Sequence, residues 1–238
     1  MTKESIPFIC LIPTLLLFSA CLRDDENQFF VLGQVEGASG KLYLLEQKTS
    51  ELLTIDSVNP DANGLFHCSV ATDETSIYAL RVAPDDQVVF IASPRDTIRV
   101  SGRLDIYPPK FRVSGNNESE LLQTFYDYSA ENLRKVDSLQ LIIDKRQGEP
   151  GFYELTVRVD SLCNQIWEAQ RQCEKTFILE HAGAFSTLLV VNYHFGVRPV
   201  LSAKTDAEDY RRVDSGLMAT YPGNRHTLFF HQWLRGVK

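Results

Sequence analysis

The side chains best suited to covalent or redox chemistry in this sequence are its cysteines. Cys10 and Cys21 lie in and just after an apolar N-terminal run, so the folded part keeps three others. These are Cys68, Cys163 and Cys173, and no pair of them has the CxxC spacing of a redox dithiol or zinc site. Cys163 and Cys173 fall on one predicted helix roughly 15 Å apart, too far for a disulfide. Cys68 could pair with either, but we expect these thiols to be buried as small apolar side chains.

The histidines give no metal-binding pattern either. His226 and His231 are five positions apart, which places them about 140° apart around a helix. His67 and Cys68 are neighbours in a predicted strand, so their side chains point to opposite faces, with His67 expected at the surface. No HExxH, GxSxG, P-loop or GxGxxG motif occurs in the sequence. We therefore predict a protein that is not an enzyme and that holds no metal or cofactor.

A modification is suggested by four short matches that read Asp, Ser or Thr, then an aliphatic residue. They are Asp56-Ser57-Val58, Asp96-Thr97-Ile98, Asp137-Ser138-Leu139 and Asp160-Ser161-Leu162. The pattern resembles the O-glycosylation acceptor of Bacteroidetes envelope proteins, and a bulky glycan requires a surface position. We predict that one or more of Ser57, Thr97, Ser138 and Ser161 is glycosylated. Ordinary strand-end structure would equally explain the first two matches.

The N-terminal segment has the features of an export signal. Lys3 precedes an apolar run from Ile6 to Phe18, which meets the small residues Ser19 and Ala20. The run is shorter than the roughly 20 residues of a membrane-spanning helix. Phe18-Ser19-Ala20-Cys21 resembles the bacterial lipobox, in which the cysteine receives diacylglycerol and becomes the mature N-terminus. We predict a lipoprotein signal peptide at 1–20, lipidation of Cys21, and a membrane partner held through that lipid.

An acidic segment follows the predicted anchor. Residues 21–28 include Asp24-Asp25-Glu26 and resemble the tether that exports some Bacteroidetes lipoproteins to the cell surface; a solvated linker is the alternative. The expected location is the outer membrane of the cell envelope, on the periplasmic side or at the surface. The chain carries a net charge of −7 and has no basic run, which argues against nucleic acid as a partner.

Residues 29–115 show the short alternating runs and turn residues of an all-β domain. The predicted strands are Phe29–Val35, Lys41–Glu46, Leu52–Val58, Leu65–Val70, Ser76–Val82, Gln87–Ala92, Thr97–Ser101 and Lys110–Val113. Asn63-Gly64 is the sharpest turn signal, because both residues tolerate the positive φ of a tight hairpin. We expect an antiparallel β-sandwich or a barrel-like domain.

Residues 116–238 change to helical periodicity. Asn117 with Glu120 resembles a helix start, and a stripe from Leu122 to Ile143 is followed by the breaker Gly148-Glu149-Pro150-Gly151. A second stripe runs from Leu155 to Phe177, so the two form an αα-hairpin. Three further helices are predicted, at Ala184–Phe195, Asp206–Ala219 and Arg225–Leu234. The fold class is α+β, with a small helical bundle packed on the sheet.

Several strands carry a family resemblance. The residues concerned are Phe30-Val31-Leu32-Gly33-Gln34-Val35, Ile55-Asp56-Ser57-Val58, Gly64-Leu65-Phe66, Ile77-Tyr78-Ala79-Leu80, Asp96-Thr97-Ile98-Arg99-Val100-Ser101-Gly102 and Phe111-Arg112-Val113-Ser114-Gly115. They resemble a β-domain of unknown function in Bacteroidetes lipoproteins that usually precedes a thioredoxin-like domain, and the helical half resembles the linker bundle between the two. Arg95 stands where the family usually has glycine in its Gly-Asp-Thr-Ile turn.

We expect no counterpart of the thioredoxin domain that this resemblance implies, because the sequence ends at Lys238, where that domain would begin. Without a CxxC motif there is no dithiol to cycle. We therefore expect a non-catalytic accessory lipoprotein that binds an envelope protein partner. The alternatives are a binding module for an envelope glycan or peptide, and a degenerate relative of the thiol-disulfide oxidoreductase lipoproteins.

Overall fold

The computed structural model describes residues 27–38, 40–83, 86–104 and 110–237. The predicted lipobox Cys21 and most of the predicted tether lie outside these residues. In the described part, no helix is both long enough and apolar enough to cross a membrane.

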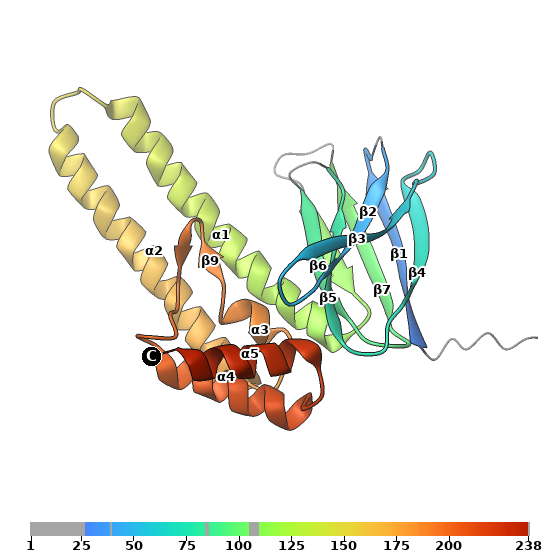
Figure 1. The fold of residues 1–238 in the computed structure, drawn as a ribbon. Helices are drawn as coiled ribbons and strands as arrows, with labels where there is room; N and C mark the ends of the chain where they lie inside the picture. Colours follow the sequence, from blue (N-terminus) through green and yellow to red (C-terminus); the bar gives the residue numbers. More distant parts are fainter. Residues whose placement is uncertain (1–26, 39, 84–85, 105–109, 238) are drawn as a thin grey trace, which may run out of the picture.

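The N-terminal half is a sandwich of two four-stranded sheets, followed by helices (Figure 1), so the predicted α+β class is confirmed. Its strands begin and end within two residues of the predicted bounds. They are β1 (Gln28–Glu36), β2 (Leu42–Gln47), β3 (Leu52–Val58), β4 (Leu65–Ala71), β5 (Ser76–Arg81), β6 (Gln87–Ala92), β7 (Thr97–Arg103) and β8 (Lys110–Ser114). The strand order is β4-β1-β7-β8 in one sheet and β3-β2-β5-β6 in the other.

Alternation of side chains builds the sandwich core. Along β1, Phe29, Val31 and Val35 are fully buried, while Leu32 between them is exposed. The aromatic rings of Phe29, Tyr78 and Phe90 meet at the centre of this core. One pair of strands departs from the antiparallel prediction, since β1 runs parallel to β7. The chain can return in the same direction because the strands of the second sheet, together with β4, lie between these two in the sequence.

The turn at Asn63-Gly64 is present, but it does not close a hairpin between paired strands. It joins β3 to β4, and these strands belong to different sheets. Gly64 has a φ of +77°, and a Cβ there would lie 2.3 Å from the carbonyl oxygen of Val35. The Asp61 carboxylate accepts the backbone amides of Asn63 and Leu65. The positive φ was therefore predicted correctly at Gly64 but not at Asn63, and the use of this turn at a crossing between sheets was not predicted.

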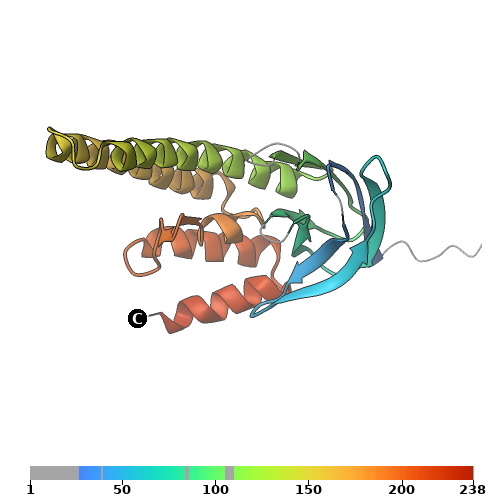
Figure 2. The same cartoon turned by 90° about the horizontal axis from the view of Figure 1, so that it is seen from above.

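The predicted αα-hairpin is confirmed and forms a long arm (Figure 2). The helix α1 (Asn117–Arg146) and the helix α2 (Phe152–His181) are joined through Gly148 and Gly151, which have φ values of +82° and +79°. The short helix α3 (Thr187–Val190) follows, and the chain ends with α4 (Ala207–Thr220) and α5 (Arg225–Gly236).

Two helix predictions need correction. The long helix predicted at Ala184–Phe195 is wrong: only α3 forms there, followed by the short strands β9 (His194–Phe195) and β10 (Arg198–Pro199). Gly196, with a φ of +64°, turns the chain between these two strands. The start of α1 was predicted one residue late, because the side chain that caps its first turn belongs to Asn116.

The residues of α1 that face α2 recur at alternating spacings of three and four, as in a coiled coil, and we call these positions the seam. On α1 the seam positions are Leu122, Phe125, Ser129, Asn132, Val136, Leu139 and Ile143, so a polar layer interrupts an apolar row. On α2 the buried Gln170 and Glu174 face that layer. Polar side chains at such positions disfavour other registers, because a shifted helix would leave them unpaired.

Candidate functional site

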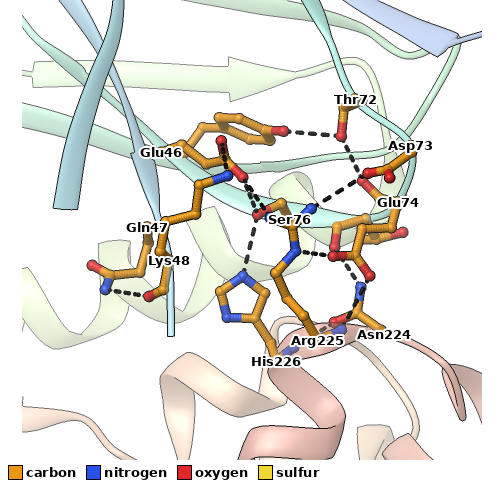
Figure 3. A network of polar contacts seen from close by, with 12 residues as sticks. Glu46, Gln47, Lys48, Thr72, Asp73, Glu74, Ser76, Asn224, Arg225 and His226 are labelled. Carbon is orange, nitrogen blue, oxygen red and sulfur yellow. Dashed lines mark hydrogen bonds and ion pairs between the residues drawn. The ribbon is translucent and has the colours of Figure 1, made fainter. Parts of the chain in front are cut away.

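The helical half is fastened to the sandwich by a polar network, which we call the junction (Figure 3). Arg225, at the start of α5, reaches three acidic side chains of the sandwich. Its guanidinium is hydrogen-bonded to Glu74 and lies 3.3 Å from the Asp73 carboxylate and 3.6 Å from the Glu46 carboxylate. The side-chain amide of Asn224 donates to the carbonyl of Thr75 at 2.6 Å.

The centre of the junction is a contact between Ser76 of β5 and His226 of α5. The Ser76 Oγ lies 3.2 Å from the His226 Nε2 and donates a hydrogen bond to the Glu46 carboxylate. Burial, and then the neighbouring Arg225 charge, lower the pKa of His226, so the ring is neutral at pH 7. In hydrolase triads the carboxylate orients the histidine ring, whereas here it contacts the serine. Ser76 is fully buried and His226 is 7% exposed, so the pair acts as a joint between the two halves.

A second attachment lies where α1 begins. The Ser119 hydroxyl donates a hydrogen bond to the carbonyl of Ile91 and accepts one from the amide of Ile91. These two hydrogen bonds occupy the outer edge of β6. Asn116 donates to the same carbonyl. The Glu118 carboxylate accepts two backbone amides from the segment before α3 and a hydrogen bond from the Tyr221 hydroxyl. These contacts bind the base of α1 to both the sandwich and the C-terminal helices.

Beyond this base α1 runs away from the sandwich (Figures 1 and 2), and a cleft of about 990 Å³ lies between α1 and β8. The vertex of the cleft is closed by Gln123, whose side-chain oxygen accepts the amide of Val113 at 3.2 Å. The cleft is lined from the sandwich by Gln34, Glu36, Ser101, Gly102, Arg103, Lys110, Phe111 and Arg112, and from α1 by Asp127, Ala130, Leu133, Arg134, Asp137, Ser138 and Leu141. We call it the β8–α1 cleft.

The two walls of the β8–α1 cleft carry different charges. Lys110 and Arg112 stand on the sandwich wall, and neither forms an ion pair with any residue that the structure describes. The wall formed by α1 presents Asp127, Asp137 and the aliphatic Leu133, together with Arg134, which forms an ion pair with Glu131. A cleft of this size with a few convergent polar groups has the properties of a binding site.

The polar layer between α1 and α2 contains a buried carboxyl group, that of Glu174. Glu174 is fully buried, and burial raises the pKa of its carboxyl to about 8. Gln170 donates to Ser129 and to one oxygen of Glu174, and Asn132 donates to Gln170. The other Glu174 oxygen has no partner within the described residues. The carboxyl is therefore protonated at neutral pH.

Beside this layer, an ion-pair group holds α2 to the segment before α4. Burial pushes the pKa of Asp206 upward, but hydrogen bonds, of which that from Arg171 is the strongest, outweigh this effect and lower it. The Lys175 ammonium lies 3.2 Å from the same carboxylate. Arg171 and Arg198 also lie over the ring of Trp167. All of these contacts serve packing between elements.

The three cysteines that the structure describes are free thiols with raised pKa values. Burial, and then the Asp56 charge, raise the pKa of Cys68 to about 11. Burial also raises the pKa of Cys163 and of Cys173, both of which are only partly buried, so the expected burial is confirmed for Cys68 and wrong for the other two. Redox-active thiols have lowered pKa values, so the three thiols lack the activation of a nucleophile.

The predicted glycosylation sites lie on three parts of the fold, and the matches at Ser138 and Ser161 are on neighbouring segments of the arm, since Ser138 and Leu162 line the same pocket. Ser57 is exposed on the edge strand β3, Ser138 and Ser161 are exposed on the arm, and Thr97 is half-buried at the start of β7. Strand-end structure accounts for one match, because the carboxylate of Asp96 accepts the amide of Ser93 and a hydrogen bond from Asn116.

The histidines are likewise dispersed. The prediction for β4 is confirmed, with His67 exposed and Cys68 buried on opposite faces. On α5, His226 faces Ser76 while His231 lies 3.0 Å from the Asp214 carboxylate. The described residues contain no group of three or more potential ligands that could hold a metal ion.

The fold and the cleft define a class of protein: a β-sandwich with an attached helical arm and a cleft between them. Residues 29–122 match the model of a domain of unknown function, DUF4369. The match covers the sandwich and the first residues of α1, and it leaves the arm and the C-terminal helices outside. No curated protein matches the chain.

Proposed function

We propose that this protein is a non-catalytic, lipid-anchored accessory protein of the bacterial envelope that binds a protein partner. The observation that carries the proposal is the β8–α1 cleft, whose α1 wall is fixed to the sandwich by hydrogen bonds of Ser119 with Ile91 and of Gln123 with Val113. A cleft fixed in this way requires little ordering of the protein on binding, which lowers the cost of association. The buried Ser76–His226 pair and the raised thiol pKa values argue against hydrolase and redox chemistry.

The partner test uses a photo-reactive amino acid placed in the lipidated protein in its native envelope. The label replaces Leu141, which lines the cleft and is 56% exposed, or Leu179, which lies on α2 outside the cleft and is 63% exposed. We expect one protein to cross-link from position 141 and not from position 179. Equal cross-linking from both positions, or none from position 141, would refute a partner in the cleft.

Anchoring is the second part of the proposal and rests on the lipobox resemblance at Cys21. Labelling with a clickable fatty acid should mark the wild-type protein and not the Cys21→Ala variant, which should appear in the soluble envelope fraction. Protease treatment of intact cells then distinguishes the two faces of the outer membrane. Digestion would place the protein at the surface, and protection would place it on the periplasmic side.

The runner-up function is binding of an envelope glycan or peptide, and the polar lining of the β8–α1 cleft favours it over the remaining alternatives. Glycosylation at Ser57, Thr97, Ser138 or Ser161 is a separate proposal. The exposure of Ser57, Ser138 and Ser161 supports it. An intact mass equal to that of the bare lipidated polypeptide would eliminate it.

A further inference from the structure

The outer edge of β8 is an open edge of a sheet. In the strand order β4-β1-β7-β8, β8 has a hydrogen-bonded neighbour on one side only, the strand β7. The opposite edge strand of the other sheet, β6, is occupied at Ile91 by the Ser119 and Asn116 side chains. The corresponding edge of β8 is covered at one place, where Val113 donates its amide to Gln123.

That single hydrogen bond fixes the direction of the remaining backbone groups. Because the amide of Val113 points to α1, the pair Val113 and Val100 does not exchange backbone hydrogen bonds in the β7–β8 ladder. The pattern alternates every second residue, so the amide and the carbonyl of Phe111 also point away from β7. Both groups therefore face the β8–α1 cleft, which Phe111 lines.

The cleft has the space that an additional strand needs. Its volume of about 990 Å³ is at the upper end of ordinary ligand pockets. A strand added to β8 would lie about 4.8 Å from it, between β8 and the wall formed by α1. On that wall Ala130, Leu133 and Leu141 provide apolar surface.

The side chains around the edge select the sequence of the strand. Lys110 and Arg112 lie on one face of β8 and Phe111 on the other, and directly opposed residues of neighbouring strands share a face. The two cations form no ion pair with described residues, so acidic residues opposite them gain attraction. Residues on the Phe111 face meet an aromatic ring and should be aliphatic.

We propose that the β8–α1 cleft captures an extended peptide segment of the partner, in which acidic and aliphatic residues alternate, as an added strand on β8. This inference rests on the proposed function and names how the partner binds. Strand addition of this kind obtains its affinity from backbone hydrogen bonds and its selectivity from alternate side chains.

The test measures binding of a fluorescein-labelled peptide, Val-Glu-Val-Glu-Val-Glu, to the mature protein by fluorescence anisotropy. We expect saturable binding, and weaker binding when lysine replaces glutamate. Methylation of the backbone nitrogens at one alternate set of residues should weaken binding by about tenfold or more, because only that set faces β8. Methylation at the other set should leave binding unchanged. No saturation below about 1 mM, or equal effects of both sets, would overturn the proposal.

Two variants locate the site without disturbing the core. Leu141→Glu should weaken binding, whereas Leu179→Glu, at a similarly exposed leucine outside the cleft, should not. The double variant Lys110→Glu/Arg112→Glu should reverse the preference towards the lysine peptide, and Arg158→Glu on α2 is its control. Retention of wild-type binding in Leu141→Glu would overturn the assignment. A dimer that the peptide dissociates would identify a second copy as the occupant and also overturn it.

The two proposals can fail separately. If the partner cross-links from position 141 but the peptide does not bind, the partner uses the cleft without adding a strand. If neither experiment succeeds, the proposed function fails as well.

Discussion

Replacement of Glu174 by glutamine should make the protein less sensitive to rising pH. In the folded protein burial raises the pKa of this carboxyl to about 8, whereas an unfolded glutamate titrates near 4.5. Between these values the folded state keeps a proton that the unfolded state releases, so the free energy of unfolding falls as pH rises from 4.5 to about 8. This loss is absent below pH 4.5 and complete above pH 8.

The size of the effect follows from the difference in pKa. At pH 7 the unfolded carboxyl lies about 2.5 units above its pKa, and each unit corresponds to about 1.4 kcal/mol, so the wild type loses about 3 kcal/mol. Glutamine cannot release a proton and loses nothing. The new amide must be accommodated where one oxygen now has no described partner, which costs about 1–3 kcal/mol at every pH. The test is therefore how the difference in free energy of unfolding between the variant and the wild type changes with pH.

The assay is urea unfolding of the mature chain, followed by circular dichroism from pH 5 to pH 8. The difference between Glu174→Gln and wild type should move in favour of the variant by about 3 kcal/mol between pH 5 and pH 7.5. Glu180→Gln, at an exposed position on the same helix, is the matched control and should follow the wild type. Parallel pH curves for Glu174→Gln and wild type would show that the buried carboxyl is not protonated in the fold.

Three further predictions concern the junction, the cleft and the thiols. The wild type should lose stability as pH falls below 6.5, because burial lowers the pKa of the His226 ring and protonation then favours the unfolded state. His226→Gln should lose less stability over the same range. Urea titrations that show the same loss in both proteins would contradict this. Gly102→Ala should lower the free energy of unfolding by about 1–3 kcal/mol, because the added Cβ would clash with the ring of Phe111. Gly40→Ala is the control and should be nearly neutral, since an added Cβ there has no atom within 4 Å. Equal urea midpoints of unfolding for the two variants would refute the contact. Cys68 should resist iodoacetamide until the protein is unfolded, since it is buried with a pKa of about 11; labelling of the native protein at the rate of a free thiol would be inconsistent with this.

The elements of this fold could be predicted from local patterns. Alternation gave the strands, and the stripes around the Gly148–Gly151 break gave the arm, because both signals arise from neighbours in the sequence. The parallel pairing of β1 with β7 could not be predicted in this way, since strand order depends on packing between distant segments. The segment after α2 was predicted as one helix because its apolar run contains no signal that distinguishes a buried turn from a helix.

In the candidate site, too, local features could be predicted from the sequence and contacts between distant segments could not. Sequence reasoning considered chemistry in cysteines, histidines and short motifs, and it did not identify the β8–α1 cleft. The cleft depends on the angle at which α1 leaves the sandwich, and α1 is fixed there by long-range contacts such as Ser119 with Ile91 and Gln123 with Val113. Lys110 and Arg112, which lie in the last strand before α1, were the available signal, but the sequence could not show that they form no ion pair with the described residues.

The central position of β1 has a mechanical consequence for an anchored protein. Gln28–Gln34 pair with β4 and Phe30–Glu36 pair with β7, so the strand nearest the proposed anchor at Cys21 is held by ladders on both sides. Tension between the membrane and a captured partner would enter the fold through this strand and leave it near β8, which lies beyond β7 in the same sheet. A pulling force along that route loads one sheet from its centre to its edge and bypasses the arm and the C-terminal helices.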